Sequence, residues 1–221
     1  MDTVTKKADN NIAEVVGTLV SNYRYSHEIF GEGFYTVTLQ SQRTSGNIDR
    51  IECIVSDRLA GIDVDPTGTR VKVTGQFRSF NKHDDVLGKN KLILQLFVRE
   101  IEQVDDTVYD KDDIQLTGFV CKEPCYRKTP LGREVCDVLL AVNRPYGKSD
   151  YIPCICWGRN ARFAANLELG TKLNIKGRIQ SREYYKHDEN GNKEETPRIA
   201  YEVSACYIEK NKDDLNDEQG V

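Results

Sequence analysis

The sequence contains no run of apolar residues close to the roughly 18 that a membrane-spanning helix requires. Its polar first ten residues, Met1 to Asn10, lack the apolar core of a secretory signal peptide. Hydrophobic residues make up 38% and charged residues 30% of the 221 residues, as in ordinary soluble proteins. We therefore expect a cytoplasmic protein, long enough for two domains.

Several catalytic signatures are also missing. The sequence has no glycine-rich phosphate-binding loop, no paired His-Glu helix motif and no aspartate cluster placed for magnesium. His83 and His187 lie in charged runs, as solvated loop histidines do. We predict a protein that is not an enzyme and that uses no cofactor.

A disulfide framework is not predicted, because the seven cysteines are an odd number and most lie in strand-like runs. Cys121, Cys125, Cys154 and Cys156 offer a zinc site as an alternative. Their CxxxC and CxC spacings do not match the usual zinc knuckle. The prediction is reduced thiols and no metal.

Positive charge is scarce overall, since the net charge is -4, but it is concentrated. Between Ile114 and Arg182 there are 12 Lys and Arg residues against 5 Asp and Glu residues. The compensating acidic residues lie mainly in the stretches 105–113, 188–195 and 213–218. A basic segment inside an acidic protein is the electrostatic pattern of a nucleic-acid-binding surface.

The chain repeats itself at a spacing of about 101 to 104 residues. Val16 to Val20 recurs as Thr117 to Cys121, and Val71 to Phe77 recurs as Leu173 to Ile179. Two copies of one domain are therefore predicted. The expected parts are a first domain over 11–105, a linker over 106–112, a second domain over 113–209 and an acidic, disordered tail over 210–221.

Each copy is expected to hold five strands, with a helix or a short turn between the third and fourth. The helix of the second copy is predicted over Asn160 to Leu169, and the first copy has a turn around Asp57 to Ile62 instead. Long hairpins are expected at Asn81 to Asn90 and His187 to Thr196. This order is typical of an all-β protein made of two tandem OB-fold barrels. The strands of the second copy are predicted at 114–122, 135–144, 151–157, 172–182 and 198–208.

The stretch from Ala141 to Arg159 contains the only tryptophan. In the predicted strand from Tyr151 to Trp157, alternation puts Ile152, Cys154 and Cys156 on the core face. The outward face then carries Tyr151, Pro153, Ile155 and Trp157, with Tyr146 in the adjacent turn and Arg144, Lys148 and Arg159 nearby. Rings interleaved with cations are what single-stranded nucleic acid requires, because bases stack on rings while cations contact phosphates. The alternative is that the rings are ordinary core residues.

The first copy keeps the strand pattern but not the rings. Opposite Tyr146, Tyr151 and Trp157 it has Ser45, Arg50 and Ser56. Since the fold does not require aromatics there, their presence in one copy indicates a ligand. We predict that the first copy binds weakly or is mainly structural.

The second copy closely resembles the bacterial single-stranded DNA-binding protein family. The resemblance covers most of residues 113 to 208, and the motif order, spacing and helix position all agree. The matching residues are Ala141-Val142-Asn143-Arg144, Asp150-Tyr151-Ile152, Cys156-Trp157-Gly158-Arg159, Ala164-Ala165-Asn166-Leu167 with Gly170, and Gly177-Arg178-Ile179-Gln180-Ser181-Arg182.

This resemblance implies base-stacking roles for Tyr146, Tyr151, Trp157 and Tyr184. It implies phosphate contacts for Arg144, Arg159, Lys176, Arg178 and Arg182. Weaker candidates in the first domain are Arg43, Arg50, Arg78, Phe80 and Lys82. Phe80 corresponds to Tyr184 only if the alignment has a two-residue gap, and otherwise Lys82 takes that place.

The resemblance also implies sequence-nonspecific binding and protection of single-stranded DNA in replication, recombination and repair, in the bacterial cytoplasm at the nucleoid. Because the family works with four OB-folds, two per chain imply a homodimer, like its tandem-domain members. Replication or repair proteins are possible partners. The final residues, Leu215 to Val221, include acidic residues but not the family's apolar tip, so recruitment through the tail stays open. The alternatives are a protein-interaction module of the replication or restart machinery, and single-stranded RNA as the ligand.

Overall fold

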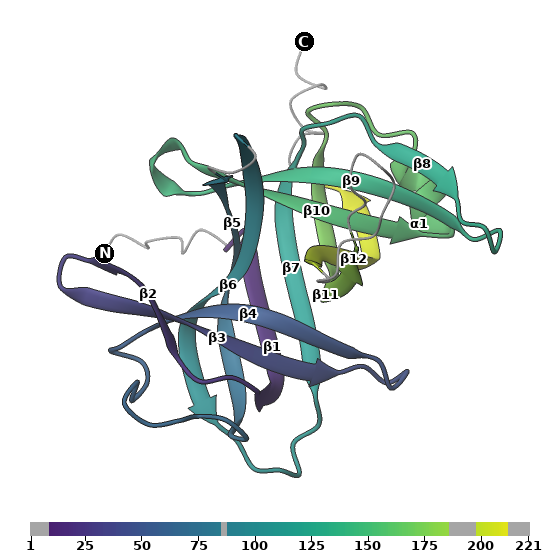
Figure 1. Cartoon of the computed structure of the whole chain (residues 1–221). Helices are drawn as coiled ribbons and strands as arrows, with labels where there is room; N and C mark the ends of the chain where they lie inside the picture. Colours follow the sequence, from purple (N-terminus) through teal and green to yellow (C-terminus); the bar gives the residue numbers. More distant parts are fainter. Residues whose placement is uncertain (1–8, 85–87, 186–197, 212–221) are drawn as a thin grey trace, which may run out of the picture.

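The computed structural model describes residues 9–84, 88–185 and 198–211, and β-strands account for most of them (Figure 1). This confirms the predicted all-β class. The first copy holds β1 (Asn11–Leu19), β2 (Arg24–Ile29), β3 (Glu32–Gln42), β4 (Ile48–Ser56), β5 (Arg70–Asp84) and β6 (Lys89–Gln103). The second holds β7 (Lys111–Val120), β8 (Cys125–Lys128), β9 (Glu134–Asn143), the 3-10 turn η1 (Pro145–Gly147), β10 (Ser149–Trp157), α1 (Arg159–Ala164), β11 (Lys172–Tyr184) and β12 (Arg198–Lys210).

Each copy closes into a barrel with the same pairing order. In the first copy β1 pairs with β3, β3 with β4, β4 in parallel with β6, β6 with β5, and β5 with β1. In the second copy β7, β9, β10, β12 and β11 pair in the same cyclic order, and β10 runs parallel to β12. These are the two tandem OB-folds that the repeat predicts.

A glycine allows the long strand of each barrel to pass close to its neighbour. The register of β5 with β6 shifts at Gly75, and the register of β11 with β12 shifts at Gly177. A Cβ atom at Gly75 would lie 2.2 Å from the carbonyl oxygen of Phe97, and one at Gly177 would lie 2.2 Å from that of Ser204. Only glycine fits at such an approach, so these bulges fix the register of each barrel.

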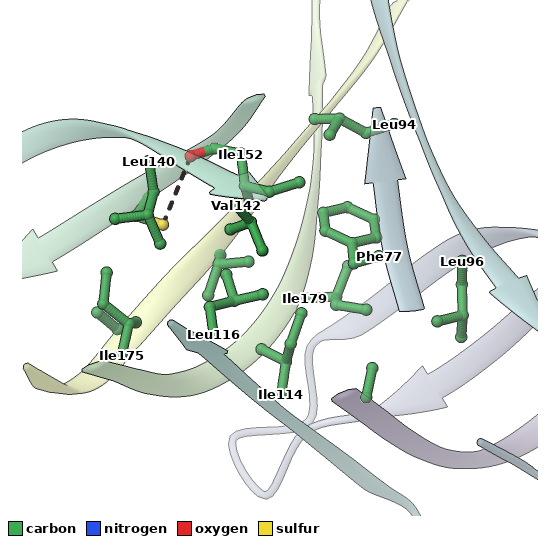
Figure 2. Close-up of a cluster of buried hydrophobic side chains, with 14 of the residues drawn as sticks. Phe77, Leu94, Leu96, Ile114, Leu116, Leu140, Val142, Ile152, Ile175 and Ile179 are labelled. Atoms are coloured by element: carbon green, nitrogen blue, oxygen red, sulfur yellow. Dashed lines mark hydrogen bonds between the residues drawn. The ribbon is translucent and has the colours of Figure 1, made fainter. Parts of the chain in front are cut away.

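The two copies join through their first strands. Strands β1 and β7 run antiparallel, with Asn11 opposite Leu116 and Val16 opposite Lys111, so a pseudo-twofold axis relates the copies. One cluster of buried hydrophobic side chains runs through both barrels. Figure 2 shows part of it, with Phe77 of the first copy and Ile179 of the second among the labelled residues. The boundary between the copies, here called the domain seam, is thus part of the core.

The largest differences from the predicted elements concern β2, β8, the end of α1 and the start of β7. Strands β2 and β8 were not predicted, because all their residues are exposed and show no alternation. Helix α1 ends at Ala164 rather than Leu169, since the chain tightens there into turns such as Leu167 N to Ala164 O. Strand β7 begins at Lys111, inside the predicted linker, because Lys111 pairs with β1.

The hairpin predicted over His187 to Thr196 and the tail beyond 211 lie outside the described residues, as do residues 85–87 of the first hairpin. Within the described residues, no helix is both long and apolar enough to cross a membrane.

Candidate nucleic-acid interface

The strand that carries the predicted rings has the expected alternation. Ile152, Cys154 and Cys156 are buried, whereas Tyr151 is 44% and Trp157 38% exposed. Ile155 is the exception, because it is only 6% exposed although it lies on the outward side with the rings. The two rings lie six residues apart on β10, which is about 20 Å along a strand. They therefore present two separate stacking surfaces.

Tyr146 lies in the turn η1 between β9 and β10, and its side chain is 99% exposed. Its φ angle is 64°, in the left-handed region that residues other than glycine seldom occupy. Lys148, next along the turn, is also exposed. A ring and a cation are thus exposed at the end of this hairpin, and among the described residues almost nothing covers the ring of Tyr146.

A groove of about 710 Å³ lies beside Trp157, here called the Trp157 groove. Glu134 forms hydrogen bonds with residues on both sides of this groove. Its Oε1 accepts a hydrogen bond from the Tyr126 hydroxyl at 2.7 Å, its Oε2 pairs with Arg162 Nε at 2.7 Å, and its backbone oxygen accepts from Gly158 N at 3.0 Å. The bonds from Tyr126 and then Arg162 lower the pKa of Glu134. Its carboxylate therefore stays charged and holds β8 and α1 around the ring.

Sequence reasoning missed the cations of this groove, which are Lys128, Arg133 and Arg162. All three lie in the basic segment that the charge count identified. Arg159, which was predicted, is exposed at the start of α1. The excess of positive charge pointed to the segment that contains Lys128 and Arg133. Their place beside Trp157 could not be predicted without knowing that β8 pairs with β9.

A second groove, of about 310 Å³ and here called the middle groove, is lined by Pro153 of β10 and Arg182 of β11. Arg127 and Lys122 reach it from the segment before β9, and Arg127 pairs with Asp137 at 3.1 Å. Arg182 is exposed, and its guanidinium lies 6.0 Å from the centre of the Tyr184 ring. Tyr184 itself is half-buried at the end of β11. The middle groove thus holds three cations together with three carboxylates, which are Glu123, Asp137 and Glu202.

Arg144 lies at the domain seam. Its Nη2 donates to Asp150 Oδ1 at 2.6 Å and to the Ser79 backbone oxygen at 2.8 Å. Asp150 is 1% exposed and also accepts from Ser79 N at 2.6 Å, while Tyr151 N donates to Ser79 Oγ at 2.7 Å. The guanidinium of Arg144 thus holds the two copies together and anchors the strand that carries Tyr151.

The first copy repeats this arrangement. Arg43 forms two hydrogen bonds of 2.5 Å with Asp49, and the pKa of Arg43 is raised by that bonding. Asp49 Oδ1 accepts from Ser181 N at 2.8 Å, and Arg50 N donates to Ser181 Oγ at 2.9 Å. Two Arg–Asp pairs therefore bridge the seam, one on each side of the pseudo-twofold axis.

Two other predicted cations lie away from the rings. Arg178 is half-buried, donates to Gln180 Oε1 at 3.0 Å and lines a seam pocket with Asp49 and Asp112. Lys176 is exposed, but it pairs across strands with residues of β7 and β12. It lies six residues, or about 20 Å, along β11 from Arg182. The structure brings Arg182 and Tyr184 together but not Lys176 or Arg178.

Among the weaker candidates, Arg78 lies 3.8 Å from the centre of the Phe97 ring, and burial lowers its pKa. Arg50 is exposed and lies 3.9 Å from Glu183 across the seam. Phe80 is 46% exposed, and Lys82 is exposed. Because Gly75 and Gly177 mark the same bulge, Lys82 corresponds to Tyr184 without a gap.

The cysteines are all free thiols. Burial raises the pKa of Cys156 to about 12 and that of Cys136 to about 11, so neither is a ready thiolate. Cys121 and Cys125 are exposed while Cys154 and Cys156 are buried. In the part of the chain that the structure covers, no group of three or more His, Cys, Asp or Glu side chains is placed to hold a metal ion.

Two closed barrels, with rings and cations on the outer strands of one, define a tandem OB-fold protein with one specialised copy. Residues 112–206 match the Single-strand binding protein family. The match spans the second copy and does not include the first.

The chain is similar to Single-stranded DNA-binding protein 2 of Listeria innocua, with 38% identity over 82 residues, covering 34% of this chain and 52% of the relative. It is 37% identical over 78 residues to Single-stranded DNA-binding protein A of Bacillus subtilis, covering 32% of this chain and 45% of that protein. The chain spans about half the length of the curated relatives it matches.

Among solved structures, the wild-type single-stranded DNA binding protein from Thermus aquaticus has a similar fold, with a TM-score of 0.71 and 20% identity. The match covers 91% of this chain and 92% of that one. At this identity the similarity shows the fold alone, but it extends over both copies.

Proposed function

We propose that this protein binds single-stranded DNA without sequence preference, through the outer face of its second OB-fold. The observation that carries the proposal is the difference between the copies. Tyr146, Tyr151 and Trp157 are exposed in one copy, while the other builds the same strands without them. The names of the related proteins support single-stranded DNA as the ligand.

In this proposal Tyr146, Tyr151, Trp157 and Tyr184 stack bases, each contributing about 1–3 kcal/mol. Phosphates pair with the exposed cations that flank the rings, which are Lys148, Arg159, Arg182, Lys128 and Arg133. Lys176 and Arg178 contact DNA only where a longer strand reaches them. Arg144 acts mainly by holding Asp150 and the strand of Tyr151 in place.

The finer part of the proposal is biological. The protein coats and shields single-stranded DNA during replication, recombination and repair, and a homodimer brings four OB-folds together. Replication or repair proteins are its expected partners. Bases lying on rings and phosphates held by cations would leave little of the strand open to nucleases or to re-pairing.

The first test uses the fluorescence of Trp157, the only tryptophan. Titration with oligothymidylate should quench it, and affinity should fall with salt by a slope near −0.7 per neutralised phosphate. Tyr151→Ala should weaken binding by about 5- to 150-fold, the equivalent of one lost base stack. Absence of both quenching and salt dependence would contradict the proposal.

The first copy offers a matched control. Arg50 occupies the position of Tyr151 and is exposed but carries no ring, so Arg50→Ala removes no base stack and should weaken binding less than Tyr151→Ala does. Thermal melting of both variants would show that each still folds.

The same titration separates the other two candidate functions. Competition between DNA and RNA oligomers of matched sequence would identify RNA as the ligand if RNA displaces DNA at lower concentration. If Tyr151→Ala combined with Trp157→Ala leaves DNA affinity unchanged, the ring-less first copy and its partners become the better explanation of function.

A further inference from the structure

The outer hairpins of the two copies carry the same exposed feature at their tips. In the first copy β2 and β3 meet at Phe30 and Gly31, and in the second copy Leu131 and Gly132 lie at the same place between β8 and β9. Each large apolar side chain directly precedes a glycine of positive φ. Phe30 is fully exposed and Leu131 is 86% exposed. Neither side chain packs into a barrel core, yet both copies keep one, which indicates a contact outside the chain.

The backbone of Phe30 is in an unfavourable conformation. Its φ angle is 51°, and Gly31 follows with a φ angle of 77°. Two-residue turns in which both φ angles are positive normally use Asn and Gly. A bulky residue in this region is strained, and such strain is typical of functional positions. The ring of His27 stacks on that of Phe34, with centres 5.1 Å apart, and so stiffens the hairpin behind the tip.

The two tips differ in charge. Residues 26–33 include two acidic residues and no Lys or Arg, whereas the equivalent residues 127–134 include three basic residues and one acidic residue. Glu28, Lys128 and Arg133 are exposed, and none forms an ion pair within the described residues. Figure 1 shows the β2 hairpin and β8 on opposite sides of the molecule, so the two tips of one chain lie far apart. Their charges are complementary to the tips of neighbouring chains.

The basic tip forms one wall of the Trp157 groove. Residues that line this groove include Lys128, Gly132, Arg133, Trp157 and Arg162. At about 710 Å³, the groove has room for a phenyl ring. The ring of Phe30 from another chain can lie against the indole of Trp157, since aromatic pairs attract each other in stacked or edge-on arrangements. The carboxylate of Glu28 then lies beside the cations of the groove.

We propose that, in the absence of DNA, the β2–β3 tip of one chain docks into the Trp157 groove of a second copy of the chain. Phe30 packs against Trp157, and Glu28 faces Lys128 and Arg133. The contact is heterologous, because it joins the first copy of one chain to the second copy of the next, so it can repeat along a row of chains. The groove is also part of the proposed DNA site, so the tip competes with DNA. This competition rests on the proposed function and adds regulation to it.

The first test measures association without DNA, by sedimentation at low salt and increasing protein concentration. The mass of the unaltered chain should rise above that of a homodimer, and added salt should reverse the rise because it screens the charges. Phe30→Ser should abolish the rise. Tyr109→Ser is the control, because Tyr109 is 90% exposed but lies between β6 and β7, outside both tips. The control should associate as the unaltered chain does, and thermal melting should show that both variants fold.

Charge reversal tests which two surfaces meet. Glu28→Lys places a cation against Lys128 and Arg133, and Arg133→Glu places a carboxylate against Glu28. Neither variant should associate alone. An equimolar mixture of the two should associate again, because the unaltered tip of the Arg133→Glu chain meets the unaltered groove of the Glu28→Lys chain. A mixture that stays dissociated would show that these surfaces do not meet.

The DNA competition is tested with an oligothymidylate of about 8 nucleotides, which fits within one OB-fold. It should quench Trp157 and return the mass of the unaltered chain to that of the Phe30→Ser variant. Quenching without this fall in mass would overturn the inference, as would an equal loss of association in Phe30→Ser and Tyr109→Ser. If no oligomer quenches Trp157, the proposed function fails, while the mixing experiment still decides whether the chains dock.

Discussion

Two equivalent residues at the domain seam, Asn11 and Asp112, differ only in that one has an amide nitrogen where the other has a carboxyl oxygen. Asn11 accepts a hydrogen bond from Phe77 N at 3.0 Å and donates to Phe77 O at 2.8 Å. At the same position of the second copy, Asp112 accepts from Ile179 N at 3.0 Å, but its Oδ2 is buried without a partner. Burial, with Asp49 nearby, raises the pKa of Asp112 to about 7. Below about pH 7 the carboxyl is therefore favoured in its protonated form, which can donate as Asn11 does.

This difference predicts a pH dependence of stability. The folded-state pKa of about 7 is above the unfolded value near 3.9, so the folded state binds the proton more tightly. The stabilising effect of the proton is complete below about pH 4 and is lost as the pH rises toward 7. Asp112→Asn should remove this slope and raise the free energy of unfolding at pH 8, measured by urea denaturation.

The converse substitution is the control. Asn11→Asp should create a second buried carboxyl, lower stability at pH 8 and add a slope of the same sign. If Asp112→Asn is no more stable than the unaltered chain at pH 8, the unpartnered oxygen costs little, and this explanation of the raised pKa is wrong.

The residue scale also shows what a single sequence could and could not reveal. Alternation along β10 predicted an outward position for Tyr151 and Trp157, and both are exposed, although Ile155 on the same side is buried. Arg144 was expected to contact phosphate, which stays a prediction, and its bond across the seam to Ser79, 65 residues away, was not foreseen. Its counterpart Arg43 offered the clue, since a residue kept in both copies serves the fold they share.

At the scale of elements, most strands could be predicted and two could not. The buried strands alternate because one side faces a barrel core, and the core face of β10 follows from that. Strand β8 is exposed throughout, so its sequence shows no hydrophobic alternation. The Trp157 groove that it borders could therefore not be predicted from the sequence. Grooves depend on which segments fold side by side, and only the structure supplies that.

The glycine bulge makes a testable claim about the long strands. Gly177→Ala would place a Cβ atom 2.2 Å from the Ser204 carbonyl oxygen, which is too close without a backbone shift. We expect a loss of about 1–3 kcal/mol in the free energy of unfolding, measured with urea. Gly61→Ala is the control, because no atom lies within 4 Å of its added Cβ. Equal stability of the two variants would contradict the role of the bulge.

At the scale of the whole molecule, the second copy matches the family model, while the fold similarity to the Thermus aquaticus protein extends over both copies. The expected homodimer would bring four barrels together. Analytical ultracentrifugation should then give twice the chain mass of 25.2 kDa. A single-chain mass at micromolar concentration would contradict the dimer but leave the DNA-binding proposal intact, since the proposed rings lie within one chain.

The β1–β7 pairing has a consequence for the chain when it is divided. Strand β1 uses both of its edges, one for β5 and one for β7. A first copy separated from the second would leave the backbone groups from Asn11 to Val16 unpaired along an open edge. Open edges recruit strands from other molecules. Pairing with the other copy therefore covers this edge and prevents self-association through it. The first copy, which lacks the rings, has this structural role for the second.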